Sequence, residues 1–133
     1  MELLSPLLRV SILIVDDSAA WRTLVQEMLQ EQPELQIIGE ACDGLEAIYR
    51  VTKLHPDLVL LDIGMPVMNG LDAADTIRQV SPRSRIVFLT QEDDVDIRDA
   101  ALAAGAHGYV LKRTRRKNFS AQSRLCCATA ITP

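Results

Sequence analysis

Cysteine is scarce in this 133-residue chain, and its three cysteines fit neither a disulfide framework nor a metal-binding motif. Cys42 stands alone, whereas Cys126 and Cys127 are adjacent, so no pair has the spacing of metal ligands. Disulfide-rich secreted scaffolds and cysteine-ligated metal centres are therefore excluded, and the thiols are interpreted as reduced and structurally incidental.

The chain also lacks long apolar runs and an excess of positive charge. Its apolar segments fall far short of the roughly 20 residues that a membrane-spanning helix needs. The N-terminus has neither the basic start nor the small-residue cleavage site of a signal peptide. The formal net charge is −4, which gives no general attraction to nucleic acids or acidic membranes. We therefore expect a cytoplasmic, single-domain protein that binds neither nucleic acid directly nor a membrane.

Strand and helix patterns alternate along most of the sequence. Apolar, β-branched runs without polar alternation predict strands that are buried on both faces, over 12–17, 35–41, 58–62, 85–90 and 107–112. The segments between these runs carry apolar residues at helical spacing, including Leu45 in the second helix and Val95 in the fourth. The alternation predicts the α/β class, with a doubly wound, five-stranded parallel sheet.

Capping and breaking residues set the expected ends of the helices. Ser18 and Asp43 are N-cap residues for the first two helices, and Pro33 is expected to end the first one. Ser81 and Pro82 close the third helix, and Gly105 ends the fourth.

Four of the predicted strands end on polar residues. Asp16 and Asp17 end the first strand, Asp62 the third, Thr90 the fourth and Lys112 the fifth. Ligands of open parallel sheets bind at the carboxyl ends of the strands, so these side chains are expected to meet at one edge. Three carboxylates, a hydroxyl and an ammonium together predict a site for a divalent cation and a phosphoryl group.

Each of these residues also has a simpler interpretation when it is taken alone. Adjacent carboxylates repel each other unless a cation such as Mg²⁺ holds them, but Asp16 and Asp17 fit equally well as acids that cap a helix. Asp62 could attack a phosphorus centre and form an acyl phosphate, or it could merely cap a loop. The joint placement of Thr90 and Lys112 favours the phospho-aspartate interpretation.

In their order these motifs resemble the receiver domain of two-component response regulators. The resemblance rests on the aspartate pair, on PDLVLLDIGMPVMNG at 56–70, on FLT at 88–90 and on GAHGYVLK at 105–112. The segment GEACDGLEAI at 39–48 is most similar to the subgroup with helix-turn-helix output domains. The resemblance implies the flavodoxin-like strand order 2-1-3-4-5, with a weak or atypical fifth helix.

The resemblance also implies a role for each site residue. Asp62 would be the phosphoacceptor and would take its phosphoryl group from a sensor histidine kinase. The Mg²⁺ ligands would be the side chains of Asp17 and Asp62, Asp16 mainly through water, and the carbonyl of Gly64. The chain would be a regulatory phosphoacceptor rather than an enzyme, with only self-phosphotransfer and self-dephosphorylation.

A switch follows from the same resemblance. Thr90 and Lys112 would contact the phosphoryl group, and Tyr109 would turn inward as Thr90 moves. This change would remodel the face formed by the 95–104 helix, the fifth strand and the fifth helix, which would then bind a partner or a second copy. Transcription regulation is the expected output.

Several positions depart from the receiver pattern. Gln91 is longer than the small residue usual beside the phosphate, and Gly64 offers no side chain to orient an attacking water. Self-dephosphorylation is therefore expected to be slow and to depend on Glu92 or on bulk access. Residues 1–112 are expected to be the receiver core. Residues 113–133 are expected to be a basic, weakly helical tail, with a possible degenerate fifth helix and no output domain in this chain.

Three rival functions share parts of the pattern. An aspartate-nucleophile phosphatase would need a second aspartate two residues after Asp62, where Gly64 stands. A flavodoxin-like FMN carrier would need a phosphate loop rich in hydroxyls and glycine, where DDSAAW is acidic. A pseudo-receiver, which would act as an interaction module without phosphorylation, is the remaining alternative.

Overall fold

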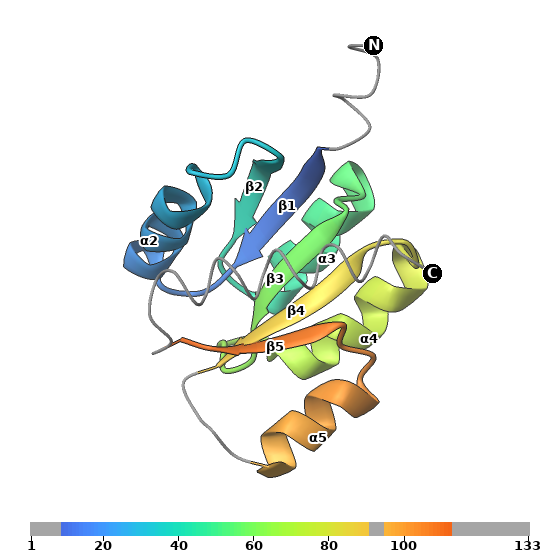
Figure 1. Cartoon of the computed structure of the whole chain (residues 1–133). Helices are drawn as coiled ribbons and strands as arrows, with labels where there is room; N and C mark the ends of the chain where they lie inside the picture. The colour runs from blue at the N-terminus through green and yellow to red at the C-terminus, as the bar shows by residue number, and fades with distance from the viewer. Residues whose placement is uncertain (1–8, 91–94, 113–133) are drawn as a thin grey trace.

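A computed structural model of the chain describes residues 9–90 and 95–112 (Figure 1). Five parallel strands form one sheet in the order β2-β1-β3-β4-β5. The strands are β1 (Val10–Val15), β2 (Leu35–Ala41), β3 (Leu58–Asp62), β4 (Arg85–Thr90) and β5 (Gly108–Leu111). The predicted α/β class and strand order are confirmed.

The described residues also form four helices, which alternate with the strands. They are α2 (Ala19–Leu29), α3 (Gly44–Leu54), α4 (Gly70–Val80) and α5 (Val95–Ala103). None of the helices within the described ranges is long and apolar enough to cross a membrane.

Alternate residues of the strands supply two separate cores, one on each face of the sheet. On one face Ile12, Ile14 and Leu60 pack with the buried residues of α2. On the other face Leu13 and Phe88 pack with the small and apolar residues of α3, α4 and α5. Strands buried on both faces need apolar residues at successive positions, which explains the runs without alternation in the sequence.

The predicted helix caps are present. The Ser18 hydroxyl accepts a hydrogen bond from the Trp21 backbone N–H at 3.1 Å, which satisfies a donor in the first turn of α2. The Asp43 carboxylate accepts from the Glu46 N–H at 2.8 Å and begins α3 in the same way. Gly105, after α5, has a φ of 91°, a conformation that favours glycine.

Some predicted boundaries and faces are wrong. The α2 helix ends at Leu29, because a turn precedes Pro33, and β1 ends at Val15, so the aspartate pair follows the strand. Leu45 and Val95 are exposed at 53% and 65%. Leu45 lies about 100° around the helix from Gly44, so it faces away from the buried stripe. The tail over 113–133, with its predicted fifth helix, lies outside the described residues, as do Gln91 and Glu92.

Gly70 is packed against the end of β3, and this contact yields a prediction. A Cβ at Gly70 would lie 2.2 Å from the Asp62 carbonyl oxygen, so backbone would have to move. We expect Gly70→Ala to lower the free energy of unfolding by about 2 kcal/mol, since overpacking outweighs the helix propensity gained. Urea denaturation measures this change.

Gly64→Ala is the matched control, because nothing lies within 4 Å of a Cβ at Gly64. We expect it to change the free energy of unfolding by no more than about 0.5 kcal/mol. Equal effects of the two substitutions would contradict the close packing at Gly70.

Candidate acidic site at the carboxyl edge of the sheet

The structure brings the predicted polar residues together at the carboxyl edge. Asp16 and Asp17 directly follow β1, Asp62 is the last residue of β3, and Thr90 is the last residue of β4. Lys112 follows β5, and its backbone N–H donates to the Thr90 carbonyl at 2.7 Å. Because the strands are parallel, their carboxyl ends lie at the same edge of the sheet, and the strands themselves bring these residues together.

Lys112 lies between two buried carboxylates. Its Nζ is 2.7 Å from Asp16 Oδ2 and 3.4 Å from Asp62 Oδ1. The three side chains are 9%, 0% and 6% exposed, in the order Lys112, Asp16 and Asp62. One ammonium faces two carboxylates, and the exposed Asp17 adds a third. The site therefore carries an excess of negative charge when all three aspartates are ionised.

Asp16 is held in place by residues of the following helix. Its Oδ1 accepts from the Ser18 N–H at 2.9 Å, and its carbonyl accepts from Arg22 Nη1 at 2.5 Å. The other carboxylate oxygen, Oδ2, is fully buried and has no directed hydrogen bond, although the Lys112 ammonium is close by. We interpret this contact as a charge pair that leaves a lone pair of Oδ2 available to another ligand.

The environment of Asp62 disfavours its charged form. Burial, followed by repulsion from Asp16, raises its pKa to about 6, although Lys112 opposes the shift. The carboxylate is thus ionised at neutral pH at a cost in stability, which a cation bound nearby would offset.

The acidic cluster fits a hard divalent cation. Carboxylate oxygens of Asp16, Asp17 and Asp62 all lie within 4.8 Å of one another. Two oxygens on one Mg²⁺ lie at most about 4.2 Å apart, so the spread of these oxygens is close to that of ligands on one ion. The space around Gly64 is open, and that opening gives a ligand access from the loop after Asp62.

The loop after Asp62 is fixed by backbone hydrogen bonds. The Ile63 N–H donates to the Leu89 carbonyl at 3.1 Å, and the Gly70 N–H donates to the Ile63 carbonyl at 2.8 Å. Val67 has a φ of 69°, which is unusual for a β-branched residue and marks a tight turn. The loop that follows the Asp62 side chain is therefore held by hydrogen bonds to β4 and within itself.

Sequence reasoning missed two side chains of α2 that contribute to the site. Lys112 Nζ lies 5.5 Å from the centre of the Trp21 ring, a cation–π contact that helps to orient the ammonium. Arg22 holds the Asp16 carbonyl, and its Nε also pairs with Glu40 at 2.8 Å. No sequence signal singled out Trp21 or Arg22 for the site.

The two residues predicted to switch lie on neighbouring strands. Thr90 is 5% exposed, whereas Tyr109 is half-buried against the core shared with α3, α4 and α5. The Arg98 guanidinium lies 5.7 Å from the centre of the Tyr109 ring. Tyr109 therefore links β5 to the side chains of α5.

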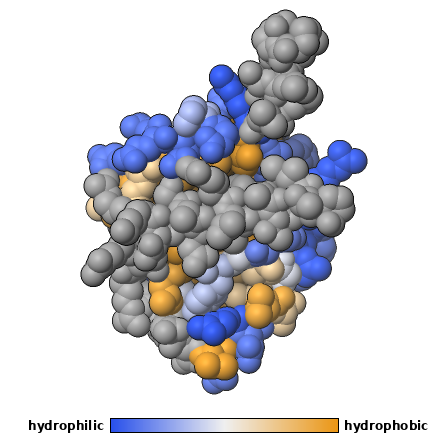
Figure 2. Space-filling view, viewed as in Figure 1, coloured by the Kyte–Doolittle hydropathy of each residue, from blue (hydrophilic) through white to orange (hydrophobic). Residues whose placement is uncertain are grey.

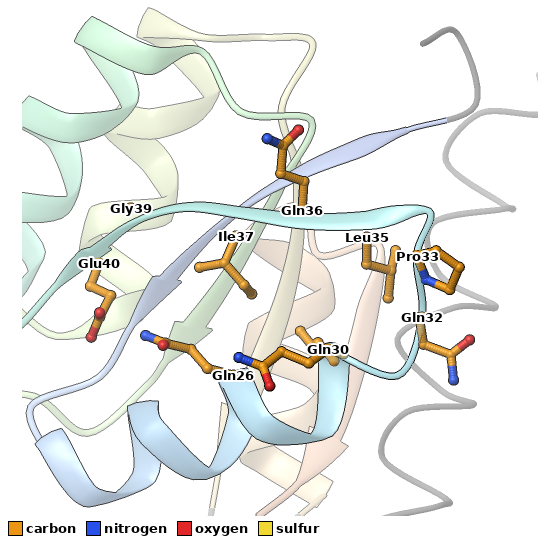
Figure 3. Close-up of a pocket in the computed structure, with 10 residues that line it drawn as sticks. Gln26, Gln30, Gln32, Pro33, Leu35, Gln36, Ile37, Gly39 and Glu40 are labelled. Atoms are coloured by element: carbon orange, nitrogen blue, oxygen red, sulfur yellow. The ribbon is translucent and has the colours of Figure 1, made fainter. Parts of the chain in front are cut away.

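A groove lies between α2 and the edge strand β2, away from the acidic cluster (Figure 3). It has a volume of about 510 Å³, and it is lined by Gln26 of α2, by Gln30 directly after that helix, and by residues of β2 that include Ile37 (Figure 3). The groove contains none of the predicted site residues.

Topology and site together define a regulatory, flavodoxin-like α/β domain with an acidic carboxyl edge. Comparison with known proteins gives the family: the chain belongs to the response regulator receiver domain family, which it matches over residues 12–123. The predicted resemblance to receiver domains is therefore confirmed. Members of this family are phosphorylated by histidine kinases and bind Mg²⁺ at an aspartate cluster.

Curated relatives with different outputs share this domain. The chain is 44% identical over 102 residues to a protein-glutamate methylesterase/protein-glutamine glutaminase of Methanosarcina acetivorans, covering 75% of this chain and 29% of that protein. It is 34% identical over 129 residues to the nitrate/nitrite response regulator NarL of Escherichia coli K12, covering 92% of this chain and 60% of NarL. The chain thus spans less than two thirds of either relative.

Solved receiver structures have the same fold. The response regulator domain of Thermotoga maritima CheB superposes with a TM-score of 0.84 at 27% identity, covering 94% of this chain and 98% of that one. The NarL receiver domain of Mycobacterium tuberculosis superposes with a TM-score of 0.84 at 29% identity, covering 90% of this chain and 97% of that one.

The raised pKa of Asp62 predicts how stability depends on pH. Its carboxyl group has a pKa of about 6 in the folded state, against an ordinary value of 3.8. The folded state therefore binds more protons than the unfolded state between these values, and stability falls as pH rises through 6. Above that pH the ionised group costs about 3 kcal/mol.

We expect Asp62→Asn to raise the free energy of unfolding by about 3 kcal/mol at pH 8 in EDTA, because the substitution removes this cost. The gain should disappear below about pH 4, where Asp62 is protonated. Urea denaturation across this range measures it, with the exposed Asp99→Asn on α5 as control. A gain that does not change with pH would contradict the electrostatic explanation.

Proposed function

We propose that this chain is a phosphorylation-dependent switch in which Asp62 accepts a phosphoryl group from a sensor histidine kinase. The observation that supports this role best is the position of Asp62: it is buried, next to two other aspartates, with Lys112 Nζ 3.4 Å away. A carboxylate oxygen of Asp62 attacks phosphorus as the bond from phosphorus to the donor imidazole breaks. The products are an acyl phosphate and free imidazole.

Asp16, Asp17 and Asp62 would hold Mg²⁺ with the Gly64 carbonyl, and the bound ion supplies positive charge to the phosphoryl oxygens. Lys112 supplies a second positive charge from within the protein. Because its ammonium is already beside Asp62, it can pair with a phosphoryl oxygen after only a small movement. The Thr90 hydroxyl is the proposed donor to another oxygen.

Phosphorylation would act by shifting the equilibrium between an inactive and an active conformation of the domain. It replaces a carboxylate with a group of charge about −1.5 to −2, and so favours the arrangement in which Thr90 and Lys112 close on that group. Movement of Thr90 leaves room for Tyr109, whose ring already contacts Arg98 of α5. Hydrophobic side chains are exposed over α5, where Val95 and Leu102 lie (Figure 2). We propose this side of the domain as the output face.

The proposed output is transcription regulation, through a partner or a homodimer formed by the α5–β5 face. The similarity to NarL, a response regulator, over 92% of this chain supports this choice. The similarity to methylesterases supports a second output, control of an attached enzyme, which the receiver itself would not catalyse.

The test is intact mass after incubation with Mg²⁺ and acetyl phosphate. We expect the wild-type chain to gain one phosphoryl group, which hydroxylamine removes as it does from acyl phosphates. Asp62→Asn should gain none, and Asp17→Asn should react much more slowly because it keeps the acceptor but loses a cation ligand.

Asp99→Asn serves as the control for loss of a carboxylate elsewhere and should react like wild type. A folded wild-type chain without any adduct would overturn the proposal and favour a pseudo-receiver. An adduct that persists in Asp62→Asn would place the acceptor elsewhere.

The open space at Gly64 predicts a slow loss of the phosphoryl group. No side chain at this position can orient a water molecule towards phosphorus, and a Cβ would meet nothing within 4 Å. We expect Gly64→Asn to shorten the lifetime of the acyl phosphate roughly tenfold by positioning that water. Gly64→Ala, which adds no polar group, should leave the lifetime unchanged.

Loss of the adduct with time, followed by mass, measures this lifetime. A wild-type half-life of seconds would contradict the predicted slow hydrolysis. An equal effect of the alanine and asparagine substitutions would contradict the role of an oriented water.

A further inference from the structure

A second polar cavity lies at the opposite edge of the sheet from the aspartates. It has a volume of about 530 Å³ and lies between the end of α4 and the segment that joins α5 to β5. Arg78, His107 and Asp75 are among its lining residues. The two edges are roughly 16 Å apart along β4, which begins at Arg85 and ends at Thr90.

Two donors compete for the imidazole of His107. The backbone N–H of Ile86 donates to His107 Nδ1 at 3.3 Å, and Arg85 Nη1 lies 3.4 Å from Nε2. A neutral imidazole has only one nitrogen that can accept a hydrogen bond. If Nδ1 accepts from the Ile86 N–H, Nε2 must carry the proton of the neutral ring. The Nε2–H group then faces an N–H group of Arg85.

A second guanidinium is fixed beside this pair. Arg78 Nη1 donates to the Ala104 carbonyl at 3.3 Å, and the side chain lies directly over Gly105. A Cβ at Gly105 would be 2.6 Å from Arg78 Nε, so the glycine leaves the room that the guanidinium occupies. The arginine is therefore held in position at the cavity.

The electrostatics of the cavity agree with this arrangement. Burial, and then the positive charges of Arg85 and Arg78, lower the pKa of His107 below its ordinary value. Asp75, whose carboxylate is negative, also lines this cavity. Arg78 and His107 thus line the cavity, and Arg85 lies beside it, with its Nη1 3.4 Å from His107 Nε2.

We propose that Arg78, Arg85 and His107 form a binding site for a phosphate-type oxyanion. An oxygen to one side of the Arg85 Nη1 and His107 Nε2 pair would accept from both N–H groups and so remove their competition for one lone pair. Arg78 would donate to a second oxygen, since charge-assisted bonds from guanidinium to phosphate are strong. The ligand is either inorganic phosphate or the phosphate end of a small ester, for which the cavity has room.

The experiment is an NMR titration of the whole chain with inorganic phosphate, at constant ionic strength and in EDTA. We expect saturable shifts of the Ile86 and His107 amides at millimolar phosphate, which chloride does not reproduce. Arg78→Gln and Arg85→Gln should each weaken binding about tenfold, as expected for the loss of one charge-assisted hydrogen bond.

Arg83→Gln is the matched control, because it removes the same charge from the neighbouring turn, outside this cavity. Its affinity should stay within about twofold of wild type. Equal losses in all three variants, or shifts that do not saturate, would overturn the site and leave only a general attraction to positive surface. Circular dichroism establishes that each variant is folded.

Glycerol phosphate, titrated in the same way, separates the two sources of the phosphate group. Tighter binding than inorganic phosphate assigns the site to esters, and weaker binding assigns it to the free ion. The absence of shifts with both probes would overturn the proposal.

Discussion

The pairing of one buried ammonium with two buried carboxylates is the interaction on which the site depends. Lys112 is close enough to Asp16 and Asp62 to offset part of their desolvation, but a single positive charge cannot neutralise both. Burial first, and then repulsion from Asp16, raises the pKa of Asp62 to about 6, and Lys112 offsets only part of this shift. The cluster therefore keeps an excess of negative charge when its aspartates are ionised, and the proposed divalent cation would offset that excess.

The sheet provides the precision that this interaction requires. Asp62 and Thr90 are the last residues of adjacent strands, and Lys112 continues from β5 beside Thr90. Apolar packing on both faces holds these strands in register, while the close approach of Gly70 fixes the loop that leaves β3. The proteins similar to this chain include a methylesterase and a nitrate/nitrite response regulator, so domains of this family occur in proteins with different names and lengths.

The sequence predicted the sheet and the position of the polar residues at its carboxyl edge, because both depend on short-range patterns. An apolar run that ends in Asp62 or Thr90 predicts both a buried strand and a polar residue at its carboxyl end. Contacts between distant elements were not predictable in this way. The position of Trp21 over Lys112 depends on how α2 packs, and the exposure of Leu45 depends on which face of α3 meets the sheet. The convergence of Arg78 and Arg85 on His107 likewise required the fold.

The most direct measurement of the central claim is a carbon-13 NMR titration of the Asp62 carboxyl group, with and without Mg²⁺. In EDTA the account predicts a midpoint near the pKa of about 6 that burial and Asp16 impose. Addition of Mg²⁺ should lower the midpoint markedly, because the cation stabilises the ionised form. A midpoint close to the ordinary value of 3.8 that Mg²⁺ leaves unchanged would contradict the account.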